Sequence, residues 1–167
     1  MTKMLKSGID EFELRYATRE DTSLILEYIK KLAVYEKMEN QVLADEKMLE
    51  DSLFNRKKAE VLLAYYMKKP VGFMLFFHNF STFEGKPGIY LEDLFIDEDM
   101  RKNGFGKEML SCLARIAVER DCKRLEWACL DWNSPSIKFY KSLGAVAMDE
   151  WTVYRMTGQS LLKLADG

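Results

Sequence analysis

A short turn at residues 101–106, R-K-N-G-F-G, carries two basic residues and two glycines and directly precedes a segment with helical spacing of apolar residues. The first turn of a helix presents unpaired N–H groups and a partial positive charge. Glycines let the backbone approach phosphate oxygens closely. The turn therefore predicts an anion site, and the alternative is a plain strand-to-helix turn with glycines for packing.

Two common phosphate motifs do not match this turn. A Walker A motif would need glycine at Arg101 and a hydroxyl residue at Glu108, and a dinucleotide motif would need glycine at Met109. The motif that remains, R-x-x-G-x-G, is too short to identify a ligand without its flanking segments.

Two adjacent carboxylates, Glu92 and Asp93, interrupt the apolar run 89–96 just before the turn. A carboxylate in an apolar strand loses hydration, so its pKa should rise and it can accept a proton from an amine, directly or through water. Adjacent strand residues point to opposite faces, so one of the two should face solvent unless a bulge intervenes. Glu92 is our candidate base.

Histidine and cysteine chemistry has little support. A histidine-dependent triad would rest on His78 alone, and a structural strand residue is the simpler interpretation. The cysteines, Cys112, Cys122 and Cys129, are odd in number and lack CxxC spacing. They fit neither a zinc site nor a disulfide framework and indicate a reducing compartment. We expect no metal.

Composition excludes further classes of protein. The 167 residues carry 25 Lys and Arg against 27 Asp and Glu, so the chain lacks the basic footprint of a nucleic-acid-binding protein. No stretch of about 18 apolar residues and no N-terminal signal region is present, so we expect no membrane span and a cytoplasmic location. The length suits a single domain at 11–167, after a flexible extension at 1–10.

The periodicity of apolar residues predicts a mixed α/β domain around one sheet. A capping-box-like Thr18 and Asp21 should open the first helix, Asp45 should cap the second, and Ser134 should cap a later one. The second helix should carry an apolar stripe of Met48, Leu49, Leu53 and Phe54. The expected strands are 11–16, a hairpin of 60–67 and 71–80 with Pro70 at its turn, then 89–96, 124–130, 145–148 and 152–156. The expected helices run from 18 to about 35–37, after Asp45, after Gly106, and from Pro135 up to Gly144, which ends the helix. Residues 161–165 form a short apolar tail.

The flanking segments carry a family resemblance. R-x-x-G-x-G after an acidic strand resembles the acyl-CoA pyrophosphate loop of the Gcn5-related N-acetyltransferase (GNAT) superfamily, and 132–140 resembles its second cofactor element. Segments 35–39, 90–95 and 161–165 resemble the spermidine/spermine (diamine) acetyltransferases. The resemblance runs from about Phe12 to Ala165. It implies a single mixed, mostly antiparallel sheet flanked by helices, and a homodimer.

The resemblance also implies site residues. Tyr140 would protonate the coenzyme A thiolate, and Glu92 would assist deprotonation of the amine. Acetyl-CoA would be held by backbone N–H groups of Leu94, Phe95 and Ile96, by the turn residues Arg101, Lys102, Asn103, Gly104, Phe105, Gly106 and Lys107, and by Asn133, Ser134, Pro135 and Ser136. The amine would be bound by Tyr35, Glu36, Glu92, Asp93 and Asp149, with Glu150 as an alternative to Asp149.

The implied reaction is direct acetyl transfer from acetyl-CoA to a primary amine of a small polycationic substrate such as spermidine, spermine or putrescine. Two alternatives stay open: the same chemistry on a thialysine-like amino acid or a protein amine, and a non-catalytic acyl-CoA-binding module. Two positions depart from the family pattern, Phe83 where Trp is frequent and Lys102 where Gly is common. Phe83 leaves the preferred amine open.

Overall fold

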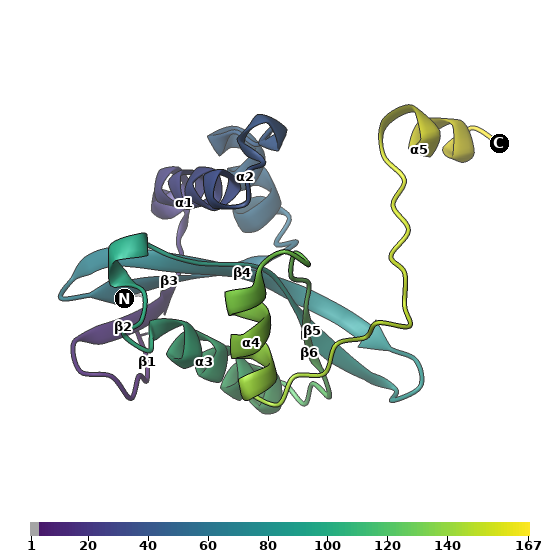
Figure 1. Ribbon diagram of the computed structural model, residues 1–167. Helices are drawn as coiled ribbons and strands as arrows, with labels where there is room; N and C mark the ends of the chain where they lie inside the picture. Colours follow the sequence, from purple (N-terminus) through teal and green to yellow (C-terminus); the bar gives the residue numbers. More distant parts are fainter. Residues whose placement is uncertain (1–3) are drawn as a thin grey trace. The chain divides into compact units, whose positions relative to one another are not determined.

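A computed structural model describes residues 4–167 of the chain (Figure 1). The chain divides into two units, Met1–Ala128 and Cys129–Gly167. The single domain at 11–167 stays a prediction. The first three residues of the expected extension lie outside the described residues, and Met4–Leu5 of that extension form strand β1.

The first unit is built on one mixed sheet. Its strands run β1-β2-β3-β4-β5-β6 across the sheet, all neighbours antiparallel except β5 and β6, which are parallel. The strands after β1 are β2 (Phe12–Tyr16), β3 (Glu60–Tyr66), β4 (Lys69–Ser81), β5 (Lys86–Ile96) and β6 (Leu125–Trp127). The predicted architecture, a mostly antiparallel sheet flanked by helices, is confirmed.

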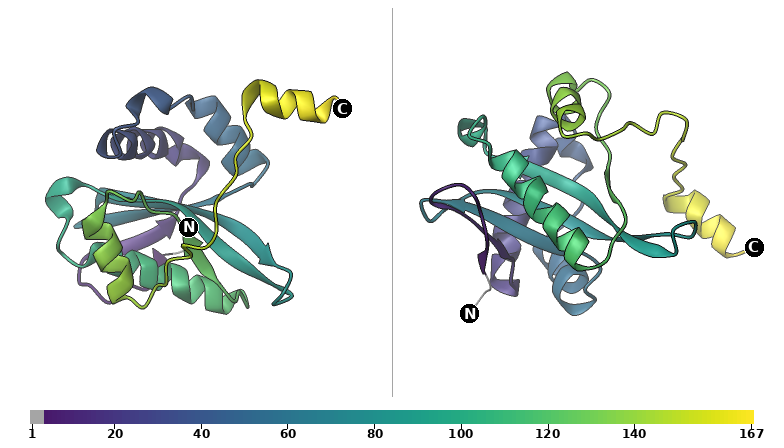
Figure 2. Two further views of the ribbon diagram at one scale, coloured as in Figure 1. Left: turned by 45° about the vertical axis from the view of Figure 1, so that its right-hand side comes forward. Right: turned by 90° about the horizontal axis from the view of Figure 1, so that it is seen from below.

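Helices cover both faces of this sheet (Figures 1 and 2). Helices α1 (Thr22–Tyr35) and α2 (Glu46–Glu50) lie over one face, and α3 (Phe105–Glu119) lies over the other. Short irregular turns complete the unit: 3-10 turns at Arg19–Asp21, Glu39–Gln41 and Glu98–Met100, and a π turn at Asp51–Asn55.

Two of the predicted helix starts are present. Asp21 closes a capping box because its carboxylate accepts from the backbone N–H of Thr18 at 2.7 Å. The same carboxylate forms a two-pronged ion pair with Arg15, at 2.8 Å for each contact. Asp45 caps α2 by accepting from the N–H of Met48 at 2.7 Å. The side chain of Met48 is 57% exposed, so its place in the predicted apolar stripe is wrong.

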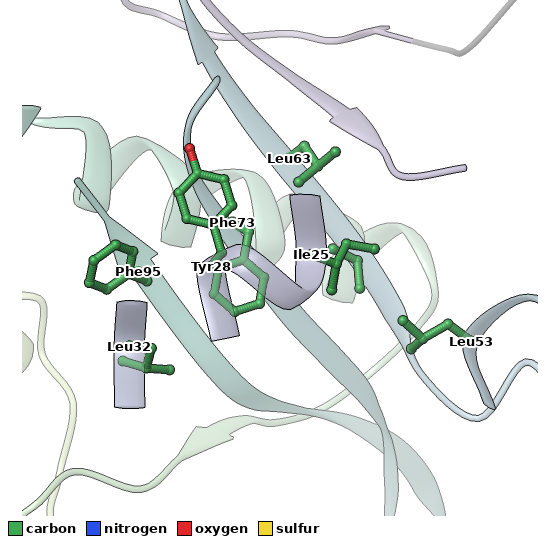
Figure 3. Packing of buried hydrophobic residues seen from close by; sticks show 8 residues of the cluster. Ile25, Tyr28, Leu32, Leu53, Leu63, Phe73 and Phe95 are labelled. Atoms are coloured by element: carbon green, nitrogen blue, oxygen red, sulfur yellow. The ribbon is translucent and has the colours of Figure 1, made fainter. Parts of the chain in front are cut away.

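The core under α1 joins that helix to the middle strands. Figure 3 shows the packing of Tyr28 against Phe73. Their ring centroids are 5.6 Å apart, and the planes of the two rings are nearly parallel. The other members of this cluster are Ile25, Leu32, Leu53, Val61, Leu63 and Phe95. On the opposite face, Phe12 of β2 stacks on Phe105 at the start of α3.

The turn between β3 and β4 differs from the prediction. It is made by Met67 and Lys68, both with positive φ (48° and 65°), as the tight turns that match strand twist require. Pro70 cannot supply a positive φ, since its ring fixes φ near −65°. It lies instead in β4, opposite Tyr65, where the register shifts and a missing N–H is tolerated.

The second unit contains helices α4 (Ser134–Ser142) and α5 (Gly158–Ala165). Asn133, rather than the predicted Ser134, caps α4, because its side chain accepts from the N–H of Ser136 at 3.4 Å. The strands predicted at 145–148 and 152–156 are wrong, since residues 145–157 form neither helix nor strand. Alternating apolar residues supply the period of a strand but no neighbouring strand to pair with.

Candidate active site

Strand β5 carries a bulge at its acidic pair. Asp93 lies opposite Leu75 and Leu91 lies opposite Phe76, so Glu92 is an extra residue without a partner in β4. Leu91 is buried, Glu92 is exposed and Asp93 is partly buried. The bulge that the sequence left open is therefore present, and the carboxylate that faces solvent is Glu92, our candidate base.

The same point of β5 is where its other neighbour ends. The parallel pairing of β5 with β6 stops at Leu91 and Trp127. Beyond it, the residues Leu94, Phe95 and Ile96 pair with Met74, Phe73 and Gly72 of β4. Their opposite edge does not pair with β6. The predicted backbone N–H donors belong to this unpaired stretch of β5.

Asp93 lies in an electrostatically unusual position. Burial, together with the smaller effects of the negative charges of Glu92 and Glu36, raises the pKa of Asp93 to about 7. Glu36 is itself partly buried, and burial raises its pKa. Three carboxylates from β5 and from the end of α1 therefore lie close enough to influence one another.

Tyr35 and Arg101 are brought together although 65 positions separate them. The guanidinium of Arg101 lies 4.6 Å from the centroid of the Tyr35 ring and 5.5 Å from that of Phe95. Its Nε donates to the carbonyl of Ile96 at 3.1 Å. A residue predicted for the cofactor and one predicted for the amine are thus in direct contact.

Asp97 holds α1 against the end of β5, a role that sequence reasoning missed. It accepts from Lys31 Nζ at 3.1 Å and from the Tyr28 hydroxyl at 3.3 Å. Neither partner belongs to a recognisable motif. The only sequence signal was the helical spacing of Tyr28 and Lys31 on α1, and this spacing does not indicate a contact with Asp97. These contacts position the end of α1, and hence Glu36, beside β5.

The glycine turn has the geometry of an anion cradle. Gly104 is the residue before α3, with a φ of +81° and no side-chain cap on the helix. A Cβ at Gly106 would meet the Ile96 side chain at 3.6 Å. Lys102 adopts a φ of 67°, the left-handed conformation that favours glycine, and its side chain is exposed. The free N–H groups at the start of α3 and the nearby basic residues suit a phosphate-bearing ligand.

Gly104→Ala should separate backbone strain from ligand binding. A left-handed alanine costs roughly 1–2 kcal/mol of stability, and the altered turn should also weaken acetyl-CoA binding severalfold. Gly85 is a matched control, since its φ is +61° and a Cβ there would meet nothing within 4 Å. Urea unfolding should show similar losses for both variants. Calorimetry should show weaker acetyl-CoA binding for Gly104→Ala alone, and equal binding by the two variants would exclude the turn from the ligand site.

Family membership can now be judged against this geometry. The Acetyltransferase (GNAT) family model matches residues 25–145, well over half of the chain. The chain belongs to the GNAT family. The matched range holds most of α1, the bulged strand β5, the glycine turn and α4. GNAT enzymes use acetyl-CoA, and the cradle before α3 fits such a ligand.

Several curated relatives of this acetyltransferase are similar over most of its length. A thialysine N-epsilon-acetyltransferase of Bos taurus is 32% identical, with 91% of this chain and 96% of that protein covered. An L-ornithine N5-acetyltransferase of Arabidopsis thaliana is 29% identical, with 89% and 85% covered. A spermidine/spermine N(1)-acetyltransferase-like protein of Homo sapiens is 30% identical over 97% of this chain and 25% of that protein. The names of these three relatives all specify N-acetylation, but each specifies a different amine.

The remaining predicted residues of the acetyltransferase lie in the second unit. Asn133 is buried at the start of α4, and Tyr140 lies on the same helix with its ring 5.5 Å from that of Phe139. Asp149 and Glu150 are both exposed in the segment without regular structure. The roles of Tyr140, Asp149 and Glu150 stay predictions.

Two kinds of feature are absent from the described residues of the acetyltransferase. Within residues 4–167, no cluster of three or more His, Cys, Asp or Glu side chains could hold a metal ion. Over the same range, no helix is long and apolar enough to cross a membrane. Phe83, the position that departs from the family pattern, is fully exposed at the turn between β4 and β5.

Proposed function

We propose that this acetyltransferase moves an acetyl group from acetyl-CoA to a primary amine of a small polycationic substrate, a diamine or polyamine such as putrescine, spermidine or spermine. The observation that carries the proposal is the set of three carboxylates, Glu36, Glu92 and Asp93, whose negative charges oppose one another. A substrate with two or more positive charges would relieve this repulsion, whereas a neutral or anionic substrate would not.

The donor has a matching set of residues. The glycine turn and the N-terminus of α3 would hold the pyrophosphate, with Arg101, Lys102 and Lys107 adding positive charge. The open edge of β5 at Leu94–Ile96 would hold the part of the donor that carries the acetyl group, and Asn133, Ser134, Pro135 and Ser136 would complete the binding residues. When bound, acetyl-CoA supplies the acetyl group as a thioester that an amine can attack.

The reaction requires two proton transfers, one from the amine and one to the departing sulfur. The amine arrives as an ammonium with a pKa near 10.4 and has no free electron pair until it loses a proton. We propose that a carboxylate of the Glu92–Asp93 pair accepts that proton and that the Tyr140 hydroxyl gives one to the departing sulfur. The amine forms the new C–N bond directly, so no acetylated side chain is needed.

A panel of amines tests the proposal. With acetyl-CoA in excess, spermidine, spermine and putrescine should be acetylated faster than thialysine, ornithine or a lysine peptide. Glu36→Gln should raise the KM for the polyamines about tenfold, the equivalent of about 1.4 kcal/mol. Glu13→Gln, at an exposed residue of β2, should leave the KM unchanged. Release of the coenzyme A thiol, measured with a colorimetric reagent, gives both the rate of acetylation and the KM.

The second candidate is acetylation of the side-chain amine of a free amino acid. The names of the thialysine and ornithine relatives favour it. Turnover of thialysine or ornithine with all three polyamines inert would overturn the polyamine proposal and support this candidate.

We also propose a cytoplasmic homodimer. The second unit supports an apolar contact surface, because large side chains there are exposed, among them Val153 at 86% and Tyr154 at 92%. Sedimentation equilibrium tests this proposal, since a dimer would give a measured molecular mass of twice the chain mass. A single species at the chain mass would exclude it.

A further inference from the structure

We infer that Asp93, rather than the neighbouring Glu92, accepts the proton from the substrate amine. This inference rests on the proposed function and specifies which carboxylate of the pair accepts the proton. Four observations lead to it: the bulge, the burial of the two side chains, the charges around them, and the position of Glu36.

The bulge gives the two carboxylates different places in the sheet. In a regular strand, both residues would be paired in the ladder. Here Glu92 is the inserted residue, without a partner in β4, and it is exposed. Asp93 returns to the ladder opposite Leu75 and is partly buried. Glu92 is therefore the solvent-exposed carboxylate of the pair, and Asp93 is the partly buried one that belongs to the ladder.

The charges around Asp93 favour a protonated form near neutral pH. The titratable groups that act on it are Glu92 from its own strand and Glu36 from the end of α1, and both are acidic. The residue opposite it in β4, Leu75, carries no charge. Burial and these two acids together bring the pKa of Asp93 to about 7. A base is most effective when its pKa lies near the working pH.

The raised pKa of Asp93 narrows the difference between this carboxyl and the amine that gives up the proton. A carboxyl with a pKa of about 7 lies about 3 units below an amine at 10.4. Burial that raises the pKa of an acid also lowers the pKa of an ammonium in the same place, which narrows the difference from both sides.

The step balances as a simple proton transfer. One N–H bond of the substrate ammonium breaks, its electron pair stays on nitrogen, and an O–H bond forms on the Asp93 carboxylate. The neutral amine that results can form the C–N bond. Asp93 then returns its proton to solvent, for which the exposed Glu92 beside it is a short relay.

The test is the pH dependence of kcat/KM for Asp93→Asn and Glu92→Gln, with the best amine of the panel. The wild-type profile should fall below about pH 7. In Asp93→Asn, kcat/KM at pH 7.5 should be at least 100-fold lower than in the wild type. The acidic limb, which is the fall below about pH 7, should be absent from its profile, and kcat/KM should rise tenfold per pH unit as free amine becomes available. Glu92→Gln should keep the limb and move it to lower pH, because one negative charge near Asp93 is gone. Glu13→Gln serves as the unchanged control.

A second measurement is independent of turnover. With carboxyl-labelled aspartate, NMR should show a carbon signal that titrates near pH 7 and is missing in Asp93→Asn. Circular dichroism shows whether each variant is folded. If the acidic limb survives in Asp93→Asn and disappears in Glu92→Gln, the inference is wrong and the proposed function stands. A folded wild-type protein that acetylates no amine of the panel overturns both.

Discussion

Tyr140→Phe is expected to lower kcat by about 100-fold or more while leaving the affinity for acetyl-CoA within a factor of two or so, since general acid catalysis contributes about 10²–10⁴. The substitution removes one hydroxyl and keeps the aromatic ring, which lies 5.5 Å from that of Phe139 on α4. Helix α4 should therefore stay folded. Stopped-flow or steady-state thiol release gives kcat, and calorimetry gives the affinity.

The chemistry of the leaving group sharpens this test. A phenol has a pKa near 10 and a thiol one near 8.5, so a proton from tyrosine matters most when the thiol is a poor leaving group. An acetyl donor with a more acidic thiol should therefore reduce the defect of Tyr140→Phe. Tyr154→Phe is the matched control, since Tyr154 is an exposed tyrosine of the same unit. An unchanged kcat in Tyr140→Phe would remove this residue from the mechanism.

Phe73→Ala is expected to lower the free energy of unfolding by about 3–5 kcal/mol, the usual cost of emptying a buried aromatic position. Phe73 is 0% exposed, and its ring is stacked on Tyr28 of α1. Since small proteins are stable by about 5–15 kcal/mol in total, this single change should bring the first unit close to unfolding. Loss of the Tyr28 contact should also loosen α1, which carries Glu36 at its end.

Urea unfolding provides the measurement, with the midpoint and the slope both recorded. Phe73→Leu keeps most of the apolar volume and should lose less than half as much stability. Phe83→Ala removes a fully exposed aromatic ring from the turn between β4 and β5 and should change stability by no more than about 0.5 kcal/mol. Equal losses for Phe73→Ala and Phe83→Ala would contradict the assigned core.

Local signals in the sequence predicted much of this fold. The capping box at Thr18 and Asp21 and the cap at Asp45 depend on residues three positions apart, so their partners are visible in the sequence itself. Helical spacing predicted α1, α3 and α4 for the same reason. The start of α4 was placed one residue late because Asn133 and Ser134 are both good caps.

The errors arose where a distant part of the chain decides the outcome. Met67 and Lys68 have no local preference for positive φ, so the adjacent Pro70 was taken for the turn residue. Residues 145–156 have the alternation of a strand, but alternation does not supply a partner.

The site shows the same division between local and distant information. The motifs identified the glycine turn and the acidic pair as the places for chemistry. They could not show that Arg101 lies against Tyr35, or that Glu36 lies near enough to Asp93 to alter its pKa. Burial and charge at Asp93 depend on how α1 packs on β5, which neither segment encodes alone.

The bulge at Glu92 has a consequence for how this enzyme can change over generations. Eleven residues of β5 lie opposite ten residues of β4, Gly72–Ser81. The chemistry at this position therefore depends on residue number as well as residue type. A substitution at Glu92 can preserve the offset, whereas loss of one codon there would remove the bulge and close the ladder between Leu91 and Asp93, with the later residues of β5 keeping their partners in β4. The strand should thus tolerate replacements far better than deletions.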